Sequence, residues 1–216
     1  MDARELSDLR REYAAGGLDE ADLDPDPISM FRRWMHDAVR ARLHEPNAFI
    51  LSTCGAEHGP ASRIVLLKGL DERGFVFFTN YTSRKGAELA DDPRCAMLFP
   101  WHALERQVRI EGDAVRLTDA ENDAYFATRP RTSQVGAWAS HQSTVVPDRQ
   151  SLDALYDEVL ARFGDAEVPR PGHWGGYCVV PRSVEFWQGR LGRMHDRLRY
   201  RRAAEPNGWS TDRLAP

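Results

Sequence analysis

The sequence predicts a mainly β protein of the α+β class, in which antiparallel strands form a closed or partly closed barrel with a few helices at its periphery. Two observations carry this prediction. At least six segments have the composition and alternation of β-strands. The helical segments interrupt these strands and do not alternate with them regularly, which argues against a doubly wound parallel sheet.

The predicted strands begin after residue 47, where the apolar period changes from helical to extended. Gly55 to Pro60 form a turn, so the first two strands are expected to pair as a hairpin. Asp71 to Gly74 form a second turn. Strands are expected at 48–53, 63–68, 75–79, 95–101, 105–117, 175–180, 184–188 and 197–202, with a last one near Trp209.

The predicted helices open at capping residues. Asp26 supplies an N-cap and Pro27 a first-turn proline for an amphipathic helix that ends near Pro46. Thr118 and Glu121 form a capping box for a later helix. Helices are expected at 26–46, 83–93, 118–130 and 152–163.

Length, charge and cysteine content bound the function. The 216 residues suffice for a flexible N-terminal arm over 1–25 and one domain over 26–216. The 29 basic and 33 acidic residues give a net charge of −4, which indicates neither nucleic acid nor an anionic membrane as a partner. No segment has the length and apolarity of a membrane span. The three cysteines are far apart, so we expect reduced thiols in a soluble, cytoplasmic protein.

The common catalytic signatures are absent from the sequence. It contains no GxGxxG loop, Walker A loop, HExxH or GxSxG motif, and its seven histidines lack metal-ligand spacing, so no metal site is expected. Four cationic clusters stand out instead in an acidic protein, and phosphate is a ligand that Arg, Lys, Ser and Thr bind together. The clusters are Arg63 to Lys68, Ser83 to Lys85, Arg129 to Ser133 and Arg193 to Arg197.

Solvated surface charge is the ordinary explanation of any one cluster, but two of them argue for more. Residues 63 and 68 point to opposite faces of a strand, so Arg63 or Lys68 should face a barrel interior or an interface, where a charge needs a partner. Arg84 and Lys85 stand at the start of a helix, where cations are disfavoured unless an anion binds.

Aromatic and imidazole groups lie near the fourth cluster. Trp187 is typical of a pocket for a planar heteroaromatic ligand, although core packing is the commoner role of a lone tryptophan. His195 lies between two arginines, whose charge disfavours the imidazolium, while Asp196 opposes this effect. The residues alone predict a β-barrel protein that binds one or two phosphate-bearing aromatic ligands.

At these residues the sequence closely resembles the pyridoxine 5′-phosphate oxidase family. The resemblance begins at Arg10, ends at Pro216 and covers nearly the whole chain. Each motif is short, but their order and spacing are specific. The motifs are RREY at 10–13, RIVLLK at 63–68, SRK at 83–85, FPWH at 99–102, ERQV at 105–108, RPR at 129–131, SQ at 133–134, GAW at 136–138, WGG at 174–176, EFWQG at 185–189 and RMHDR at 193–197.

The resemblance implies a split β-barrel homodimer that binds two FMN molecules at the subunit interface, each contacted by both chains. By motif position, the FMN contacts would be Arg63, Ile64, Val65, Leu66, Leu67, Lys68, Phe78, Thr79, Arg84, Lys85, Gln107, Gln142, Ser143, Trp187 and Arg197. The phosphate end of FMN would be held by Arg63, Arg84, Lys85 and Ser143.

The resemblance also implies a reaction, the oxidation of pyridoxamine and pyridoxine 5′-phosphate by O2 to pyridoxal 5′-phosphate in vitamin B6 biosynthesis and salvage. H2O2 would be released, with NH3 from the amine. A hydride equivalent would pass from the substrate C4′ carbon to flavin N5, while the protein fixes the phosphate and stacks the pyridine ring on the flavin.

The same resemblance assigns the substrate contacts. Lys68, Tyr125, Arg129 and Ser133 would hold the substrate phosphate, and the 10–13 segment would close over the substrate. Arg193 and His195 would be the catalytic residues, beside the pyridine ring. The full set of substrate contacts would be Arg10, Arg11, Glu12, Tyr13, Lys68, Tyr125, Arg129, Ser133, Arg193, Met194 and His195.

Two residues depart from the family pattern, and two other functions stay open. Phe78 stands where the family often has Tyr, which removes one hydroxyl contact to the flavin, and Met194 stands where Leu is common. One alternative is a flavin oxidase of the same fold that acts on another aromatic compound, such as a phenazine precursor; the substrate-phosphate residues argue against it. The other is a non-catalytic flavin or pyridoxal-phosphate binding protein, which would not need Arg193 and His195.

Overall fold

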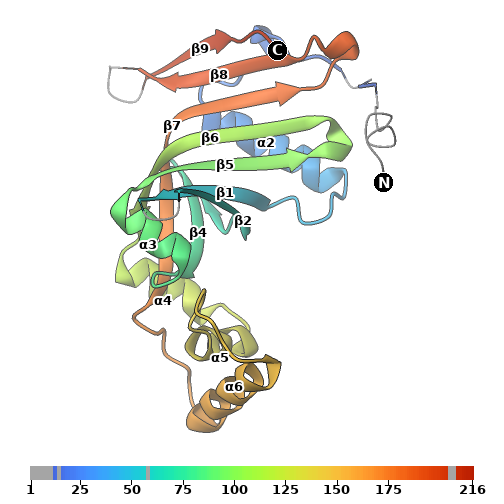
Figure 1. The fold of residues 1–216 in the computed structure, drawn as a ribbon. Helices are drawn as coiled ribbons and strands as arrows, with labels where there is room; N and C mark the ends of the chain where they lie inside the picture. The colour runs from blue at the N-terminus through green and yellow to red at the C-terminus, as the bar shows by residue number, and fades with distance from the viewer. Residues whose placement is uncertain (1–11, 14–15, 57–58, 204–207) are drawn as a thin grey trace. The chain divides into compact units, whose positions relative to one another are not determined.

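The fold is described by a computed structural model that covers residues 12–13, 16–56, 59–203 and 208–216 (Figure 1). The strands are β1 (Ala48–Gly55), β2 (Gly59–Leu66), β3 (Gly69–Leu70), β4 (Phe75–Asn80), β5 (Arg94–Trp101), β6 (Arg106–Arg116), β7 (Trp174–Gln188), β8 (Asp196–Arg202) and β9 (Trp209–Arg213). The α-helices are α2 (Pro27–Arg40), α3 (Arg84–Asp91), α4 (Asp119–Ala127), α5 (Arg131–Ala139) and α6 (Arg149–Phe163). Short 3-10 helices are η1 (Glu20–Asp22), η2 (His102–Leu104) and η3 (Leu191–Arg193).

The nine described strands form one sheet in the order β2-β1-β5-β6-β7-β4-β3, and β8 pairs with both β7 and β9. The neighbouring places of β1 and β2 confirm the predicted hairpin. In the antiparallel β4–β7 pair, Phe78 lies opposite Gly176, and in the β7–β8 pair Trp187 lies opposite Arg197. The predicted mainly β fold with a few added helices is confirmed.

The chain divides into two compact units. The first unit comprises Met1–Ile50, Ala96–Glu111 and Pro181–Pro216, and the second comprises Leu51–Cys95 and Gly112–Val180. Strands β1, β5, β6 and β7 each contribute residues to both units.

Helix α2, in the first unit, begins where the sequence predicts and ends earlier. The Asp26 carboxylate caps it by accepting hydrogen bonds from two amides of the first turn at 2.9 Å, and Pro27 is its first residue. The predicted end near Pro46 is wrong, since the helix stops at Arg40. Two residues later Arg42 adopts a left-handed φ of 54°, which an α-helix does not permit.

The core of the first unit forms where α2 packs on strand residues. Phe31 lies edge-on to Phe99 with ring centroids 4.8 Å apart, and Trp34 lies edge-on to Phe186 at 5.1 Å. Phe186 also contacts the Tyr200 ring at 5.8 Å. All five side chains are at most 2% exposed, so this aromatic cluster holds α2 on the sheet.

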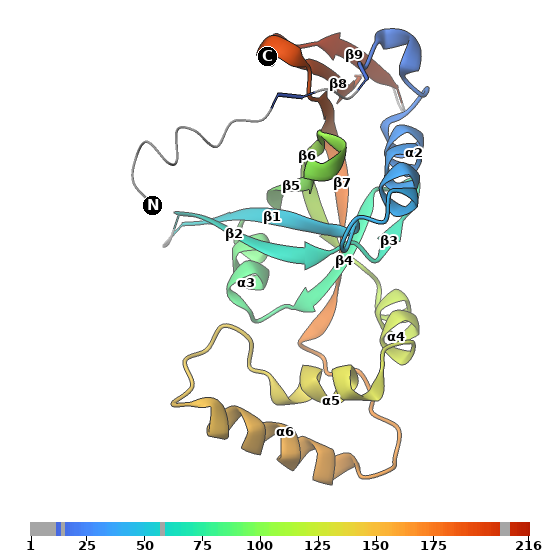
Figure 2. The same cartoon turned by 90° about the vertical axis from the view of Figure 1, so that its right-hand side faces the viewer.

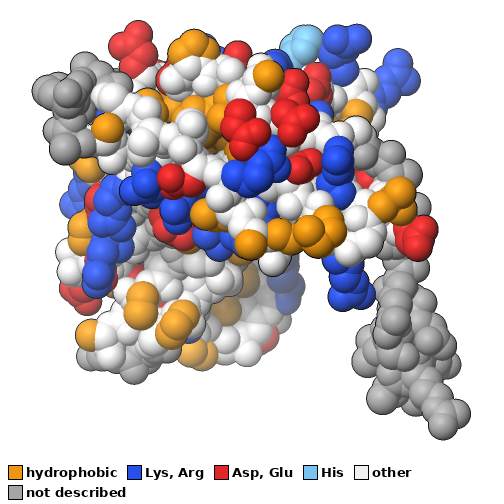
Figure 3. Space-filling view, turned by 90° about the horizontal axis from the view of Figure 1, so that it is seen from above, with side chains coloured by type: hydrophobic (Ala, Val, Ile, Leu, Met, Phe, Trp, Pro, Cys, Tyr) orange, Lys and Arg blue, Asp and Glu red, His pale blue; other side chains and the backbone are white. Residues whose placement is uncertain are grey.

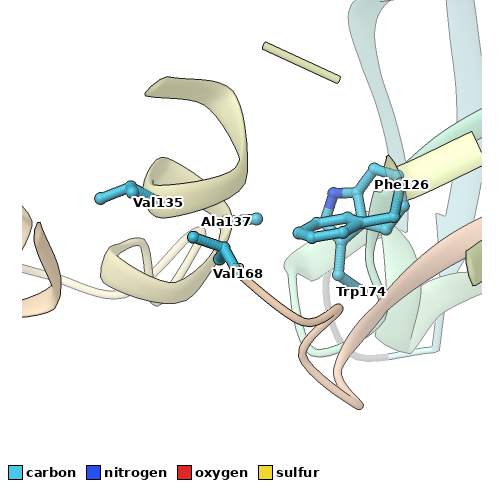
Figure 4. Packing of buried hydrophobic residues seen from close by; sticks show 5 residues of the cluster. All are labelled: Phe126, Val135, Ala137, Val168 and Trp174. Atoms are coloured by element: carbon cyan, nitrogen blue, oxygen red, sulfur yellow. The ribbon is translucent and has the colours of Figure 1, made fainter. Parts of the chain in front are cut away.

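In the second unit, helices α5 and α6 lie side by side in both ribbon views (Figures 1 and 2). The predicted capping box of α4 is present, with Thr118 and Glu121 bonded reciprocally. Figure 4 shows Phe126 against Trp174, with Val135 and Ala137 on α5 and Val168 on the segment that follows α6. These side chains are at most 9% exposed and form the core that fixes α4 and α5 beside β7.

Other elements also differ from the sequence-based expectation. Strand β2 begins at Gly59, inside the predicted 55–60 turn, and ends at Leu66, before the predicted end at residue 68. The strands predicted at 175–180 and 184–188 are one strand, β7. Pro181 is tolerated inside it because β7 pairs with β4 up to Val179 and with β8 from Ser183, so the missing proline N–H falls between these two ladders. Helix α5 was not predicted, since residues 131–139 show no clear apolar period.

Acidic and basic side chains are interspersed on the face of the molecule that Figure 3 shows. On the strand pair β8–β9, for example, Asp212 accepts hydrogen bonds from both Arg199 and Arg201. Such exposed pairs contribute little stability but keep one sign of charge from accumulating. Within the described part of the chain, no helix combines the length and apolarity that crossing a membrane requires.

We expect Phe186→Ala to destabilise the protein strongly, because it removes a fully buried ring that contacts Trp34 and Tyr200. The free energy of unfolding should fall by about 3–5 kcal/mol, measured by guanidinium titration and circular dichroism. Val39→Ala, at an exposed position of α2, is the control and should change it by less than about 0.5 kcal/mol. Equal losses for the two variants would contradict the assignment of this core.

Candidate functional site

A cavity of about 830 Å³ lies wholly within the second unit. Its walls come from β2, β4, α3, α4, α5, the start of β7 and the segment after α5. The lining residues are Ala61, Ser62, Arg63, Ile64, Val65, Leu66, Lys68, Phe78, Thr79, Asn80, Arg84, Lys85, Tyr125, Arg129, Ser133, Gly136, Ala137, Ser140, Gln142, Ser143 and Trp174. We call it the cationic cavity.

The cationic cavity carries a strong excess of positive charge. Five of its described lining residues are cations and none of them is acidic. The cations are Arg63, Lys68, Arg84, Lys85 and Arg129. Three of the four clusters singled out in the sequence therefore meet at one place, and the cavity is suited to a ligand with one or more phosphates.

Arg63 is held by several acceptors at one end of the cavity. Its Nη1 donates to the backbone oxygen of Leu51 at 3.2 Å and to Thr53 Oγ1 at 2.5 Å, and its Nη2 donates to Glu88 Oε2 at 3.2 Å. Arg63 is half-buried, as expected for one of residues 63 and 68. Lys68 follows the end of β2 and is exposed. Sequence reasoning did not single out Glu88.

Lys85 is a buried cation without an acidic hydrogen-bond partner among the described residues. Its Nζ lies 2.8 Å from Gln142 Oε1, 3.1 Å from Thr79 Oγ1 and 3.4 Å from Ser83 Oγ, to each of which it donates. Burial, with the nearby Arg63 charge, lowers the pKa of Lys85 to about 8, and the charge of Glu88 opposes this shift. An anion bound beside Lys85 would supply the missing counter-charge.

Aromatic rings form a second wall of the cavity. Phe78 stacks on Tyr125 with ring centroids 3.8 Å apart and an interplanar angle of 7°, and on Trp174 at 5.2 Å and 6°. The Arg129 guanidinium lies 4.5 Å from the centroid of the Trp174 ring. Phe78 thus builds the wall through its ring alone, and the hydroxyl of a tyrosine there is not required for the stacking.

Arg129 has an unused donor. Its Nη1 is buried and has no hydrogen-bond partner among the described residues. Burial lowers the pKa of Arg129, but a guanidinium stays charged at physiological pH. A buried cationic N–H without a partner is costly, so this position indicates a ligand oxygen that completes the site.

Backbone conformation places Ser143 and Ser133, the two serines of the cavity that were predicted as ligand contacts. Ser143 adopts a left-handed φ of 74°, which is strained for a residue other than glycine and is commonly found at ligand sites. Ser133 lies in the first turn of α5. Leu67, predicted as a contact, is not among the lining residues, while Asn80, Ser140 and Trp174 line the cavity and were not predicted to do so.

Another group of predicted site residues lies in the first unit. The rings of Tyr13, Trp187 and His195 contact one another, with centroids 5.6 Å apart for Tyr13–Trp187, 5.4 Å for Tyr13–His195 and 4.6 Å for Trp187–His195. Gly189 permits this packing, since a Cβ there would lie 2.7 Å from Tyr13 Cγ. The Arg190 amide donates to His195 Nδ1 at 3.1 Å, so a neutral imidazole carries its proton on Nε2.

The other predicted residues of this unit differ in setting. Arg193 has a left-handed φ of 60° directly after Gly192 at 65°, and Met194 is 69% exposed. Arg197 Nε donates to Glu185 Oε1 at 2.7 Å, which raises the pKa of Arg197. Gln107 is half-buried on β6 and Glu12 is exposed, whereas Arg10 and Arg11 lie outside the described residues.

Comparison with known families gives two matches that together span most of the chain. Residues 35–163 match the model described as pyridoxamine 5′-phosphate oxidase. Residues 174–216 match the model described as the pyridoxine 5′-phosphate oxidase C-terminal dimerisation region.

Individual relatives agree with these matches. The chain is 61% identical over 215 residues to a pyridoxine/pyridoxamine 5′-phosphate oxidase of Nocardioides sp. strain JS614, with 98% of each chain covered. It is 55% identical over 213 residues to the enzyme of that name from Cupriavidus necator, covering 98% of this chain and 99% of the other.

Two solved structures are similar in fold. PhzG from Burkholderia lata 383, in complex with tetrahydrophenazine-1-carboxylic acid, is 36% identical, with a TM-score of 0.86 and coverage of 94% of this chain and 99% of that one. A pyridoxamine 5′-phosphate oxidase-related, FMN binding protein from Nostoc punctiforme is 15% identical, with a TM-score of 0.69 and coverage of 90% and 100%. The second likeness concerns the fold alone, and it agrees with the predicted split barrel.

We expect the empty cationic cavity to bind sulfate more weakly as the pH rises through about 8. Anion binding favours the protonated ammonium of Lys85, which is lost above that pH, whereas sulfate keeps its charge. Calorimetric titration at pH 7 and at pH 9.5 measures the effect. In Lys85→Met, affinity should be lower and nearly independent of pH in this range, and a flat profile in the unaltered protein would contradict the role of Lys85.

Proposed function

This chain belongs to the pyridoxamine 5′-phosphate oxidase family, and from that premise we propose that it is an FMN-dependent oxidase of pyridoxamine 5′-phosphate and pyridoxine 5′-phosphate. The products are pyridoxal 5′-phosphate and H2O2, with NH3 from the amine. The observation that carries the proposal is the cationic cavity, in which the buried Arg129 Nη1 has no hydrogen-bond partner in the described part of the chain and stands beside a stacked aromatic wall.

The residues of the cavity fit the phosphate end of FMN. Arg63 and Arg84 offer planar donors, Lys85 offers an ammonium without an acidic hydrogen-bond partner among the described residues, and Ser143 offers a hydroxyl. Thr79 and Gln142, which bind Lys85 Nζ, add neutral polar groups next to these cations. We assign these side chains to FMN together with the cavity face of β2.

A second set of cavity residues fits the phosphate of the substrate. Arg129 and Lys68 supply positive charge, Tyr125 and Ser133 supply hydroxyls, and all four line the same cavity. No described residue accepts a hydrogen bond from Arg129 Nη1, so a phosphate oxygen would satisfy it. We infer that this set anchors the substrate and thereby places its ring.

The family resemblance assigns further contacts to residues of the first unit. We assign Arg193 and His195 to the pyridine ring, Met194 to its edge, and Trp187, Arg197 and Gln107 to the flavin. The segment of Arg10, Arg11, Glu12 and Tyr13 is assigned to closure over the substrate, and the contacts of Tyr13 with Trp187 and His195 support this for its last residue. The arm over 1–25 and the single domain over 26–216 remain predictions.

The proposed assembly is a homodimer with FMN at the interface, each cofactor contacted by both chains. The match of residues 174–216 to a dimerisation region supports it. These residues include β7, β8 and β9, which carry Trp187 and Arg197.

Catalysis needs orientation more than it needs a protein base. When bound, FMN supplies the redox chemistry by accepting a hydride equivalent from the substrate C4′ carbon and passing electrons to O2. The protein fixes the phosphate through Arg129 and orients the ring through Arg193, which raises the fraction of reactive geometries. His195 offers an Nε2–H to a substrate oxygen or nitrogen, because its Nδ1 accepts from the Arg190 amide.

The 36% identity with PhzG raises a second candidate, the oxidation of a phenazine precursor. A substrate without phosphate would leave Arg129 Nη1 buried and without a partner among the residues that the structure describes, which disfavours this candidate. A non-catalytic binding protein is disfavoured by the chain's 61% identity, over nearly its whole length, with a relative named as an oxidase.

The test of the proposed function is anaerobic addition of pyridoxamine 5′-phosphate to the purified, FMN-loaded protein. We expect the oxidised flavin band at about 450 nm to bleach without oxygen and to return in air. Pyridoxal 5′-phosphate and a stoichiometric amount of H2O2 should form in the same reaction. If the flavin stays oxidised with this substrate but bleaches with a phenazine precursor, the result favours the second candidate function.

We expect Arg129→Ala to raise the KM for pyridoxamine 5′-phosphate more than Arg193→Ala does. Arg129 is assigned to the phosphate anchor and Arg193 to the ring, so loss of Arg129 should cost about 10–100-fold in KM. Steady-state kinetics with both substrates measures this, and Arg149→Ala, at an exposed position of α6, is the control. Equal KM changes for the two variants would refute this division of roles.

A further inference from the structure

Glu88 is a buried carboxylate behind the phosphate end of the cationic cavity, and the assignments above give it no role. It is 4% exposed and lies on α3, one turn after Arg84. Its Oε1 accepts from Arg84 Nε at 2.7 Å, and its Oε2 accepts from Arg63 Nη2 at 3.2 Å. One acidic side chain thus bridges the two arginines assigned to the FMN phosphate.

Glu88 is ionised in this position. Burial raises the pKa of its carboxyl, but hydrogen bonds from Thr53 and Arg84 and the charges of Arg84 and Arg63 outweigh burial and lower it. Thr53, which is 3% exposed, donates to Glu88 Oε2 and accepts from Arg63. Hydrogen bonds through Thr53 therefore connect the Glu88 carboxylate to the Arg63 guanidinium.

Within the described residues, Glu88 is the acidic group that is hydrogen-bonded to the cations of the cavity. Lys85 Nζ has neutral acceptors and Arg129 Nη1 has none. The empty site therefore depends on Glu88 for its negative charge. Without it, Arg63, Arg84 and Lys85 would repel one another in a partly buried region where solvent screens charge weakly.

We propose that Glu88 is the counter-ion of the empty phosphate site and limits the affinity for FMN by competing with the phosphate for Arg63 and Arg84. The inference rests on the proposed function, because it takes the cavity to bind FMN. It makes Glu88 a residue that determines how strongly the protein distinguishes a phosphorylated flavin from a flavin without phosphate.

Glu88 has two opposing effects on phosphate binding, and the structure indicates which is larger. Glu88 orders the guanidiniums, which favours binding, and adds a like charge behind them, which disfavours it. Arg63 stays ordered without Glu88, because it also donates to Leu51 O and Thr53 Oγ1. The ordering contribution for Arg63 is therefore small, and we expect repulsion between carboxylate and phosphate to dominate.

Glu88→Gln tests the proposal, because it removes the charge and keeps the shape. FMN and riboflavin, which lacks the phosphate, are titrated into the flavin-free proteins by fluorescence quenching. We expect the FMN dissociation constant to fall about tenfold and that of riboflavin to change less than about twofold. The melting temperature of the flavin-free variant should be lower than that of the unaltered protein, since the empty site loses its counter-ion.

Two variants separate charge from other effects. Glu88→Asp keeps the charge and should not bind FMN more tightly than the unaltered protein. Asp153→Asn is the matched control, because it removes one carboxylate from an exposed pair at the same spacing, Arg149 Nε to Asp153 Oδ1 at 2.9 Å. Asp153→Asn should leave the ratio of the FMN dissociation constant to the riboflavin dissociation constant unchanged. If the glutamine variant does not fold, Glu88→Met, which replaces the buried ion by an apolar chain of similar length, gives the same test.

The outcomes distinguish this proposal from the function on which it rests. If the unaltered protein prefers FMN to riboflavin but loss of the Glu88 charge weakens FMN binding or leaves the ratio unchanged, the counter-ion role is overturned and the cofactor assignment stands. Tighter FMN binding by Glu88→Asp would equally overturn it. If the unaltered protein does not bind FMN in preference to riboflavin, both the proposed cofactor and the role of Glu88 fail.

Discussion

The second unit must accommodate the electrostatic repulsion among the cationic side chains that line its cavity. Five cationic side chains line the cavity, and four of them are accommodated in three ways. Arg63 and Arg84 share a buried carboxylate, Lys85 is solvated by neutral oxygens, and Arg129 lies over an aromatic face. By these local solutions the proposed phosphate site is held before any phosphate arrives, at the cost of leaving some charge uncompensated.

The aromatic wall gives the charged cavity a rigid boundary. Phe78, Tyr125 and Trp174 stack nearly parallel, and Trp174 also packs edge-on against Phe126 in the core of the unit. A site residue and a core residue are therefore the same side chain. This continuity means that the position of Arg129, which rests on the Trp174 ring, is fixed by packing as much as by charge.

Much of the fold and site could be predicted from the sequence, because the relevant signals are local. Capping residues such as Asp26 and Thr118 indicate where helices start, and three short cationic motifs contain residues that line the cavity. What could not be predicted depends on contacts between distant segments. Helix α5 is short and held by packing of Val135 and Ala137, and its own sequence has no strong helical period.

The same reasoning explains the residues that were missed. Glu88 stands four residues after Arg84, a spacing that predicts an ion pair on a helix, but its contact with Arg63 needs β2 to lie beside α3. The left-handed conformations of Ser143 and Arg193 have no signature in side-chain type, since both are set by the surrounding chain.

The interleaving of the two units along the chain bears on how the protein is made. The first unit is built from Met1–Ile50, Ala96–Glu111 and Pro181–Pro216, and the two segments of the second unit lie between these. During translation the aromatic core around α2 stays incomplete until Phe186 of β7 and Tyr200 of β8 have left the ribosome. The second unit, whose segments are all upstream of residue 181, is emitted first, and nascent chains should expose part of the apolar face of α2 until β8 has been made.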